Sequence, residues 1–290
     1  MRDAVALETT LLAHGVPRAE GLPLFRELTG MIERHGVSAA AVGVLRGRPV
    51  VGLTELEIAE LLATPDLPKA NTSNLGILMH RGVSAATTVS TTMELASGAG
   101  LRVFATGGLG GVHRGYGTRL DISSDLAALA RFPVAVVASG VKSILDVEST
   151  RELLETLGIP VVGLRTDAFP AFYRRDSGAR VDARIDSVDE LAAFVASELR
   201  RSGRGILICN PIPHDAELDG QEFARWLAEA ETRARHTAAA GRDVTPQILA
   251  ALHQISGGAT LRANLSLVRS NAGVAARLCA AMRARRSTTA

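Results

Sequence analysis

Short apolar runs rich in β-branched residues recur along the chain, and each predicts a buried strand. The clearest two are residues 101–106 and 134–138, and similar runs lie at 4–7, 39–44, 49–52, 161–165 and 205–209. Segments with helical spacing separate most of these runs, so strands alternate with helices about every 25–40 residues, as in βαβ units. We therefore predict one α/β domain over residues 1–290, with three α/β/α layers around a mostly parallel or mixed central sheet.

Polar residues at the ends of the helical segments predict where helices begin. A Ser or Thr followed three residues later by Glu forms a capping box. This pattern occurs at Thr54 with Glu57, Ser149 with Glu152, and Ser187 with Glu190. Elsewhere, residues 11–17 predict a turn, residues 64–74 predict a polar loop, and residues 84–97 predict one helix ended by a glycine.

The composition excludes several classes of function. Basic and acidic side chains number 32 and 30, a formal net charge of +2, and aromatic residues make up 3%, so neither charge nor stacking favours a nucleic-acid partner. Cys209 and Cys279 lie outside any metal-binding spacing, and we expect reduced core thiols. Without an apolar run of transmembrane length or a basic segment before an N-terminal apolar block, we expect a soluble cytoplasmic protein with no membrane partner.

Residues of unusual type follow each of the two clearest strand runs, at the carboxyl ends of the predicted strands. Open α/β sheets bind ligands beyond these ends. Four of the five residues 107–111 are glycine, and Lys142 follows the second run. The glycine spacing fits no dinucleotide fingerprint, because His113 stands where a third glycine is needed, and no Walker A loop, because Val141 precedes Lys142. Two interpretations stay open: a tight turn with positive φ, or a close approach of backbone N–H groups to an anionic ligand.

Residues 121–125, Asp-Ile-Ser-Ser-Asp, lead into another helical segment. Ser123 or Ser124 is the expected N-cap, and this structural role alone would explain the pattern. The alternative is an anion site at the helix N-terminus, because its bare N–H groups favour phosphate. Asp121 would then lie just outside the helix, where one carboxylate suits a largely hydrated Mg²⁺ or Mn²⁺ ion.

Lys142 and Glu8 best suit covalent and acid–base chemistry. Because Lys142 follows a buried strand, we expect its stem in the apolar layer, where desolvation favours a neutral amine that attacks a sugar carbonyl to form a Schiff base. The alternative is a lysine that extends to solvent. Glu8 also ends a strand run and suits a general acid or base, with helix capping as the alternative. By default, His14, His113 and Lys69 are turn or surface residues.

Eight segments together resemble one known family. In chain order they read ALETTLLAHGVP, AATTVSTTM, VFATGGLGGVHRG, DISSDL, SGVKSILD, TDAFPAFYRR, NPIP and VTPQILA. They are similar to segments of the pseudouridine-5′-phosphate glycosidase family, also called indigoidine synthase A-like, over nearly the whole chain. The resemblance implies an α/β/α protein that forms trimers and cleaves the C–C glycosidic bond of pseudouridine 5′-phosphate. The products would be uracil and ribose 5-phosphate, and Mn²⁺ would assist.

The resemblance also implies roles for single residues. Lys142 matches the Schiff-base lysine of the family, Glu8 its general acid and Asp121 its metal ligand. The implied substrate-binding residues are Lys69, Val89, His113, Ser123, Ser124, Asp125 and Asn264. Of these, His113 and Asn264 are expected near the base or the sugar.

A Schiff-base mechanism suits the C–C glycosidic bond, because the base leaves through a carbon atom and is a poor leaving group. Protonation of the leaving group, which suffices for O-glycosides, does not suffice here. Opening the ribose and forming an iminium at C1′ would make the sugar an electron sink. Lys142 would be the nucleophile, and Glu8 would give a proton to the uracil ring carbon. Phosphate binding at the glycine loop and the helix start, with Lys69, would position the sugar.

The sequence departs from the family in three places. It begins almost at the glutamate motif without the usual leader, residues 18–21 read RAEG in place of an Asn-containing tract, and Ser84-Ala85 replaces the usual glycine. We expect the last two changes on the base side, so two alternatives stay open. One is a C-glycosynthase that joins ribose 5-phosphate to an aromatic acceptor in natural-product biosynthesis. The other is a non-catalytic sugar-phosphate-binding module, against which the joint presence of Lys142, Glu8 and Asp121 argues.

Overall fold

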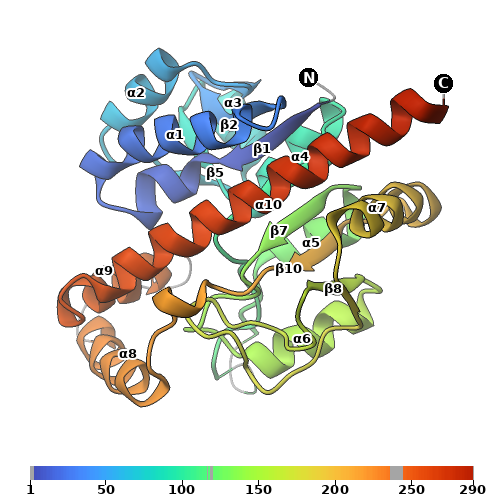
Figure 1. Cartoon of the computed structure of the whole chain (residues 1–290). Helices are drawn as coiled ribbons and strands as arrows, with labels where there is room; N and C mark the ends of the chain where they lie inside the picture. The colour runs from blue at the N-terminus through green and yellow to red at the C-terminus, as the bar shows by residue number, and fades with distance from the viewer. Residues whose placement is uncertain (1–2, 116, 118–119, 236–243, 290) are drawn as a thin grey trace.

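A ten-stranded sheet organises the computed structural model, which describes residues 3–115, 117, 120–235 and 244–289 (Figure 1). The strands run β4-β5-β2-β1-β6-β7-β10-β8-β9 across the sheet, with β3 paired to β2. Strand β2 is antiparallel to β3 and β5, and every other recorded pair is parallel. The predicted mostly parallel, mixed sheet is therefore confirmed. Its strands are β1 (Ala4–Glu8), β2 (Ser38–Leu45), β3 (Arg48–Val51), β4 (Lys69–Ala70), β5 (Ala85–Thr87), β6 (Val103–Ala105), β7 (Ala135–Ala138), β8 (Val161–Leu164), β9 (Ala183–Ile185) and β10 (Ile206–Cys209).

Helices cover both faces of the sheet, as the three-layer prediction requires. In Figure 1 the long helix α10 crosses one face beside α1 and α7, whereas α4 and α5 lie behind the sheet. The helices are α1 (Arg18–Glu33), α2 (Glu55–Ala63), α3 (Leu75–His80), α4 (Val89–Gly98), α5 (Ser124–Arg131), α6 (Val147–Thr156), α7 (Val188–Ser202), α8 (Gly220–Arg235), α9 (Val244–Ile255) and α10 (Ala259–Thr289), with a π-helical turn η1 (Leu11–Gly15) and a 3-10 turn η2 (His214–Ala216). No helix within the described residues is long and apolar enough to cross a membrane.

Three segments differ from the sequence prediction because tertiary pairing overrides local pattern. Residues 11–17 contain the helical turn η1, and the polar segment 64–74 contains strand β4. Residues 84–97 divide into strand β5 and helix α4, since β5 pairs with both β2 and β4. A strand as short as β5 carries no local signal of its own, and the neighbouring strands decide its conformation.

Two of the three predicted helix caps are confirmed. Thr54 forms the complete capping box with Glu57, and the Ser187 side chain accepts a hydrogen bond from the Glu190 backbone N–H. The third is wrong, because α6 begins before Ser149, and its cap is Asp146, whose carboxylate accepts a hydrogen bond from the Ser149 N–H at 3.0 Å. Aspartate is as good an N-cap as serine, so the sequence offered two competing starts for this helix.

Three neighbouring parallel strands bring distant residues together at one edge of the sheet. Strands β1, β6 and β7 lie side by side, with Leu7 opposite Ala105 and Ala105 opposite Val137. Their carboxyl ends therefore meet, which is where open α/β sheets bind ligands. Glu8 ends β1, Thr106 follows β6, and residues 139–142 follow β7.

A buried asparagine of α10 ties these strand ends to the helix layer. The Asn271 Nδ2 group donates hydrogen bonds to the Thr106 carbonyl at 2.8 Å and to the Ser139 hydroxyl at 3.2 Å. Its Oδ1 accepts one from the Asn210 amide at 2.9 Å. Asn271 has no exposed surface, so each of these polar groups depends on the others for its hydrogen bonds.

Replacing Asn271 with leucine should destabilise the protein by about 2–4 kcal/mol, because the buried carbonyl of Thr106 and the amide of Asn210 would lose their partner. Denaturant unfolding measures this loss. Ser270→Ala is the matched control, since Ser270 is only half-buried and also accepts from Asn210 at 2.9 Å. Equal effects of the two substitutions would contradict the assigned role of Asn271.

Candidate active site

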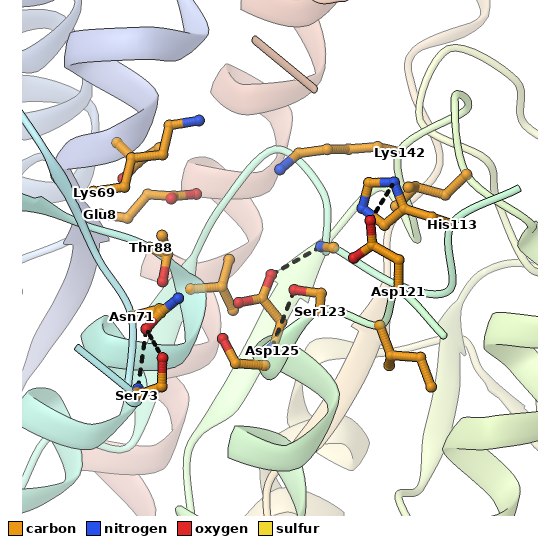
Figure 2. Close-up of a pocket in the computed structure, with 16 residues that line it drawn as sticks. Glu8, Lys69, Asn71, Ser73, Thr88, His113, Asp121, Ser123, Asp125 and Lys142 are labelled. Carbon is orange, nitrogen blue, oxygen red and sulfur yellow. Dashed lines mark hydrogen bonds and ion pairs between the residues drawn. The ribbon is translucent and has the colours of Figure 1, made fainter. Parts of the chain in front are cut away.

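Two adjoining cavities open at the carboxyl edge of the sheet. The wide one measures about 450 Å³ and the narrow one about 50 Å³. Glu8, Thr10, Lys69 and Lys142 line both cavities and so mark the place where they meet. Figure 2 shows the side chains of Glu8, Lys69 and Lys142 pointing into one shared space.

Glu8 is a buried carboxyl group at this junction, with 8% of its surface exposed. The Thr106 hydroxyl donates a hydrogen bond to Glu8 Oε1. Burial raises the pKa of Glu8 to about 7, although the charge of Lys142 and the Thr106 hydrogen bond oppose this shift. A carboxyl group that titrates near neutral pH suits a general acid or base.

Lys142 enters the site from the segment that follows β7. Its backbone N–H donates to the Leu109 carbonyl at 3.1 Å, which holds this segment against the glycine loop. Its side chain is half-buried and lines both cavities, so it points into the space that Glu8 also lines and does not extend away into open solvent (Figure 2). Lys69 and Lys142 are the only two lysines among the 32 basic residues of the sequence.

Asp125 braces the wide cavity. Its Oδ1 accepts a hydrogen bond from the Ser90 N–H in the first turn of α4 at 3.0 Å, and its Oδ2 accepts one from the Gly110 N–H at 2.9 Å. The Ser123 hydroxyl accepts from the Asp125 N–H at 3.2 Å and caps α5, as the sequence predicts. With 5% of its surface exposed, Asp125 fixes two helix starts and the glycine loop relative to one another.

The structure contradicts one of the two sequence interpretations of the glycine loop. The other, a close approach to an anionic ligand, stays a prediction, and Gly107, Gly108 and Gly110 line the cavities. Within the described chain, none of residues 107–111 has a left-handed φ, so the positive-φ explanation is wrong. A Cβ on Gly108 would lie 2.6 Å from the Phe172 ring, and one on Gly110 would lie 2.3 Å from the Ser123 hydroxyl. Side chains from other elements therefore leave no room for a Cβ atom at these positions. The Gly110 N–H donates its hydrogen bond to Asp125 Oδ2.

The wide cavity has the features of an anion site at one end. Helices α4 and α5 both begin there, with Val89 and Ser124 as first residues, and their positive dipole ends favour a phosphate. Lys69 adds a positive charge. Sequence reasoning missed three further polar residues in this wall, namely Asn71, Ser73 and Thr88.

The opposite wall holds the predicted metal ligand. Asp121 Oδ2 lies 4.0 Å from His113 Nδ1, and the His113 backbone N–H donates to the Asp121 carbonyl at 2.9 Å. Among the described residues, no three His, Cys, Asp or Glu side chains gather closely enough to hold a metal ion. The carboxylate of Asp121 is therefore the predicted protein ligand at this wall. A single carboxylate suits only a metal ion whose other ligands are water molecules or a bound substrate.

The two residues expected near the base or the sugar, His113 and Asn264, line different cavities. Asn264 lines the narrow cavity, whereas His113 lines only the wide one. The Asn264 Nδ2 group donates to the Gly15 carbonyl at 3.0 Å. The other walls are largely apolar and include Leu11, Phe172 and Leu249.

Two expectations about this region can be compared with the structure. Neither residues 18–21 nor Ser84 and Ala85 line either cavity, but the charge of Arg18 helps to lower the pKa of His14. His14, which the sequence suggested was a turn residue, lines the narrow cavity. Burial and the charge of Lys69 lower the pKa of His14 to about 4, against the opposing effect of the Leu67 carbonyl.

Comparisons with known proteins agree with this architecture. A family model described as indigoidine synthase A like protein matches residues 1–281. The chain is 44% identical to the pseudouridine-5′-phosphate glycosidase of Methylobacterium nodulans, over 98% of this chain and 85% of that one. It is 41% identical to the protein of the same name from Symbiobacterium thermophilum, over 98% and 94% of the two chains.

Two solved structures have the same fold. An indigoidine synthase A-like protein from Thermotoga maritima superposes with a TM-score of 0.88 at 38% identity, covering 95% of this chain and 91% of that one. The prealnumycin C-glycosynthase AlnA, solved with ribulose 5-phosphate, superposes with a TM-score of 0.89 at 34% identity, covering 98% and 93%.

Replacing Glu8 with glutamine should stabilise the protein at alkaline pH. The folded-state pKa of Glu8 lies near 7, above its ordinary 4.5. As the pH rises from 4.5 to 7, the unfolded chain therefore loses its proton first and folding stability falls. Above pH 7 the ionisation of buried Glu8 lowers the free energy of unfolding by at most about 3 kcal/mol. Glutamine carries no charge, so Glu8→Gln does not undergo this loss.

The measurement is the free energy of unfolding of both proteins from pH 5 to pH 8. The difference between Glu8→Gln and the wild type should grow with pH, while the exposed control Glu33→Gln stays parallel to the wild type. A constant difference for Glu8→Gln would show that the Glu8 carboxyl ionises normally.

Proposed function

The chain belongs to the indigoidine synthase A-like family, and we propose that it is a pseudouridine-5′-phosphate glycosidase. It would reversibly cleave the bond between C1′ of the ribose and C5 of uracil. The observation that carries this proposal is the position of Glu8 and Lys142 at the junction of a wide polar cavity and a narrow, largely apolar one. A bond that joins a sugar phosphate to a flat base would cross that junction.

The sugar phosphate would occupy the wide cavity. Lys69 and the N-termini of α4 and α5 would bind the phosphate, with contacts from Val89, Ser123 and Ser124. Asp125 would act mainly by holding these helix starts in place, because both of its carboxylate oxygens accept backbone hydrogen bonds. Binding energy from the phosphate would hold C1′ beside Lys142.

Cleavage would proceed through a covalent intermediate. The amine of Lys142 attacks C1′, the bond from C1′ to the ring oxygen breaks, and the ring oxygen takes the proton that the attacking nitrogen releases. Protonated Glu8 then gives its proton to C5 of the base, the C1′–C5 bond breaks, and the nitrogen lone pair forms an iminium at C1′. Water hydrolyses the iminium and releases ribose 5-phosphate. A Glu8 pKa of about 7 keeps a large share of this acid protonated at neutral pH.

Asp121 would hold a Mn²⁺ ion with His113 beside it. When bound, the ion would supply positive charge next to the sugar phosphate. One protein carboxylate suits an ion whose other ligands are water and substrate. Trimeric assembly, a cytoplasmic location and a single domain over residues 1–290 stay predictions.

The alternative of a C-glycosynthase is suggested by the relative AlnA, which shares the fold at 34% identity. The relatives at 44% and 41% identity are named pseudouridine-5′-phosphate glycosidases, which favours that function for this chain. The non-catalytic binding module is disfavoured because Glu8 and Lys142 meet in one site. An assay of uracil release from pseudouridine 5′-phosphate, beside ribosylation of an aromatic acceptor panel, tests all three functions.

Borohydride reduction in the presence of ribose 5-phosphate should trap a covalent adduct on Lys142, because the iminium of this mechanism is reducible. Peptide mass spectrometry can read the site with little ambiguity, since Lys69 is the only other lysine. Lys142→Met should form no adduct, whereas Lys69→Met should still form one at raised ribose 5-phosphate. An unmodified Lys142 in the wild type would remove the mechanism.

Chelation should lower the rate of pseudouridine 5′-phosphate cleavage at least about tenfold, and Mn²⁺ should restore it. Asp121→Asn should lose most of the Mn²⁺ response, because both carboxylate oxygens of Asp125 in the same cavity already accept backbone hydrogen bonds. Steady-state rates at increasing Mn²⁺ concentration measure this effect. A chelator-insensitive wild type would exclude Asp121 as a metal ligand.

A further inference from the structure

Three buried polar atoms at the narrow cavity have no hydrogen-bond partner in the described structure: His14 Nε2, Thr10 Oγ1 and Asn264 Oδ1. A buried polar atom without a partner costs about 1–3 kcal/mol, so three at one cavity indicate a ligand that satisfies them. The remaining such atoms belong to Thr29, Thr91, Glu94, Arg151 and Tyr173, and none of these residues lines either cavity.

The chemical character of these three atoms is well defined. The Asn264 Nδ2 group already donates to the Gly15 carbonyl at 3.0 Å, which leaves Oδ1 as an acceptor only. The Thr10 hydroxyl can donate or accept. His14 is neutral at physiological pH, because burial and Lys69 lower its pKa to about 4, so its ring offers hydrogen bonds without a charge.

The backbone presents His14 directly to the reaction centre. Turn η1 follows Glu8 with only two residues between them, and Asn264 of α10 holds the carbonyl of the next residue, Gly15. Apolar contacts from Leu11, Phe172 and Leu249 line the rest of the cavity. A few polar groups in an apolar pocket are what sets ligand specificity in small-molecule sites.

We propose that His14 is a specificity-determining residue whose Nε2 accepts a hydrogen bond from a ring N–H of the departing base, alongside Asn264 and Thr10. This inference rests on the proposed function. Uracil joined through C5 presents two ring N–H groups and two carbonyls, so it can pair with all three protein atoms. A hydrocarbon ring of the same size would leave all three buried and unpaired, and the site would reject it.

The test compares protein and ligand substitutions in the synthetic direction, with ribose 5-phosphate and uracil, 1-methyluracil or 3-methyluracil as acceptors. His14→Phe keeps a flat ring but removes both nitrogens, and it should slow C-glycoside formation with uracil at least about tenfold, the worth of one hydrogen bond. For at least one of the two methyluracils, the methyl group already blocks the N–H that His14 would recognise. With that acceptor, His14→Phe should lower the rate by less than about threefold relative to the wild type. His14→Gln should recover part of the uracil rate.

Two controls keep the outcomes distinct. The borohydride-trapped adduct with ribose 5-phosphate alone should form equally in the wild type and in His14→Phe, because it does not use the base cavity. The exposed His35→Phe should behave as the wild type. Equal losses with all three bases, or no loss with uracil, would overturn the role of His14. Failure of the wild type to form the adduct would instead overturn the proposed function.

Discussion

The structure depends on burying the carboxyl group of Glu8 where it faces the amine of Lys142. Burial alone pushes the pKa of Glu8 upward, and the lysine charge and the Thr106 hydroxyl pull it down, so the balance falls near 7. At that value neither form of the carboxyl is strongly disfavoured, which is the condition for passing a proton in both directions. The cost is stability above neutral pH, as expected for a site shaped by function.

The surrounding scaffold keeps these two groups in place through neighbouring strand ends. Asn271 links the ends of β6, β7 and β10, and Asp125 links the glycine loop to α4 and α5. The glycines let side chains such as Phe172 and Thr150 pack directly onto the loop. Close packing and paired buried polar groups both resist movement, so the loop serves as a rigid wall.

The division into two cavities separates two kinds of recognition. Beyond the shared residues Glu8, Lys69 and Lys142, the wide cavity has two helix N-termini that suit a phosphate, and the narrow one has neutral hydrogen-bonding groups that suit a base. Lysine occurs in this chain only at the junction, as Lys69 and Lys142, and the many other basic residues are arginine. Arginine stays charged, so it could not replace Lys142 as a nucleophile.

The sequence by itself determined the α/β class and most strands, because periodicity is a local signal, and its strand ends marked Glu8 and Lys142 as the candidates for the reaction. Its motifs also indicated most of the wide cavity, from Lys69 and Val89 to Ser123 and Asp125. Only the tertiary structure decided the short strand β5, the packing that demands Gly108 and Gly110, and the separation of Asn264 from His113. It also decided the neutral state of His14. These features depend on burial and on contacts between residues far apart in the chain, which no local pattern records.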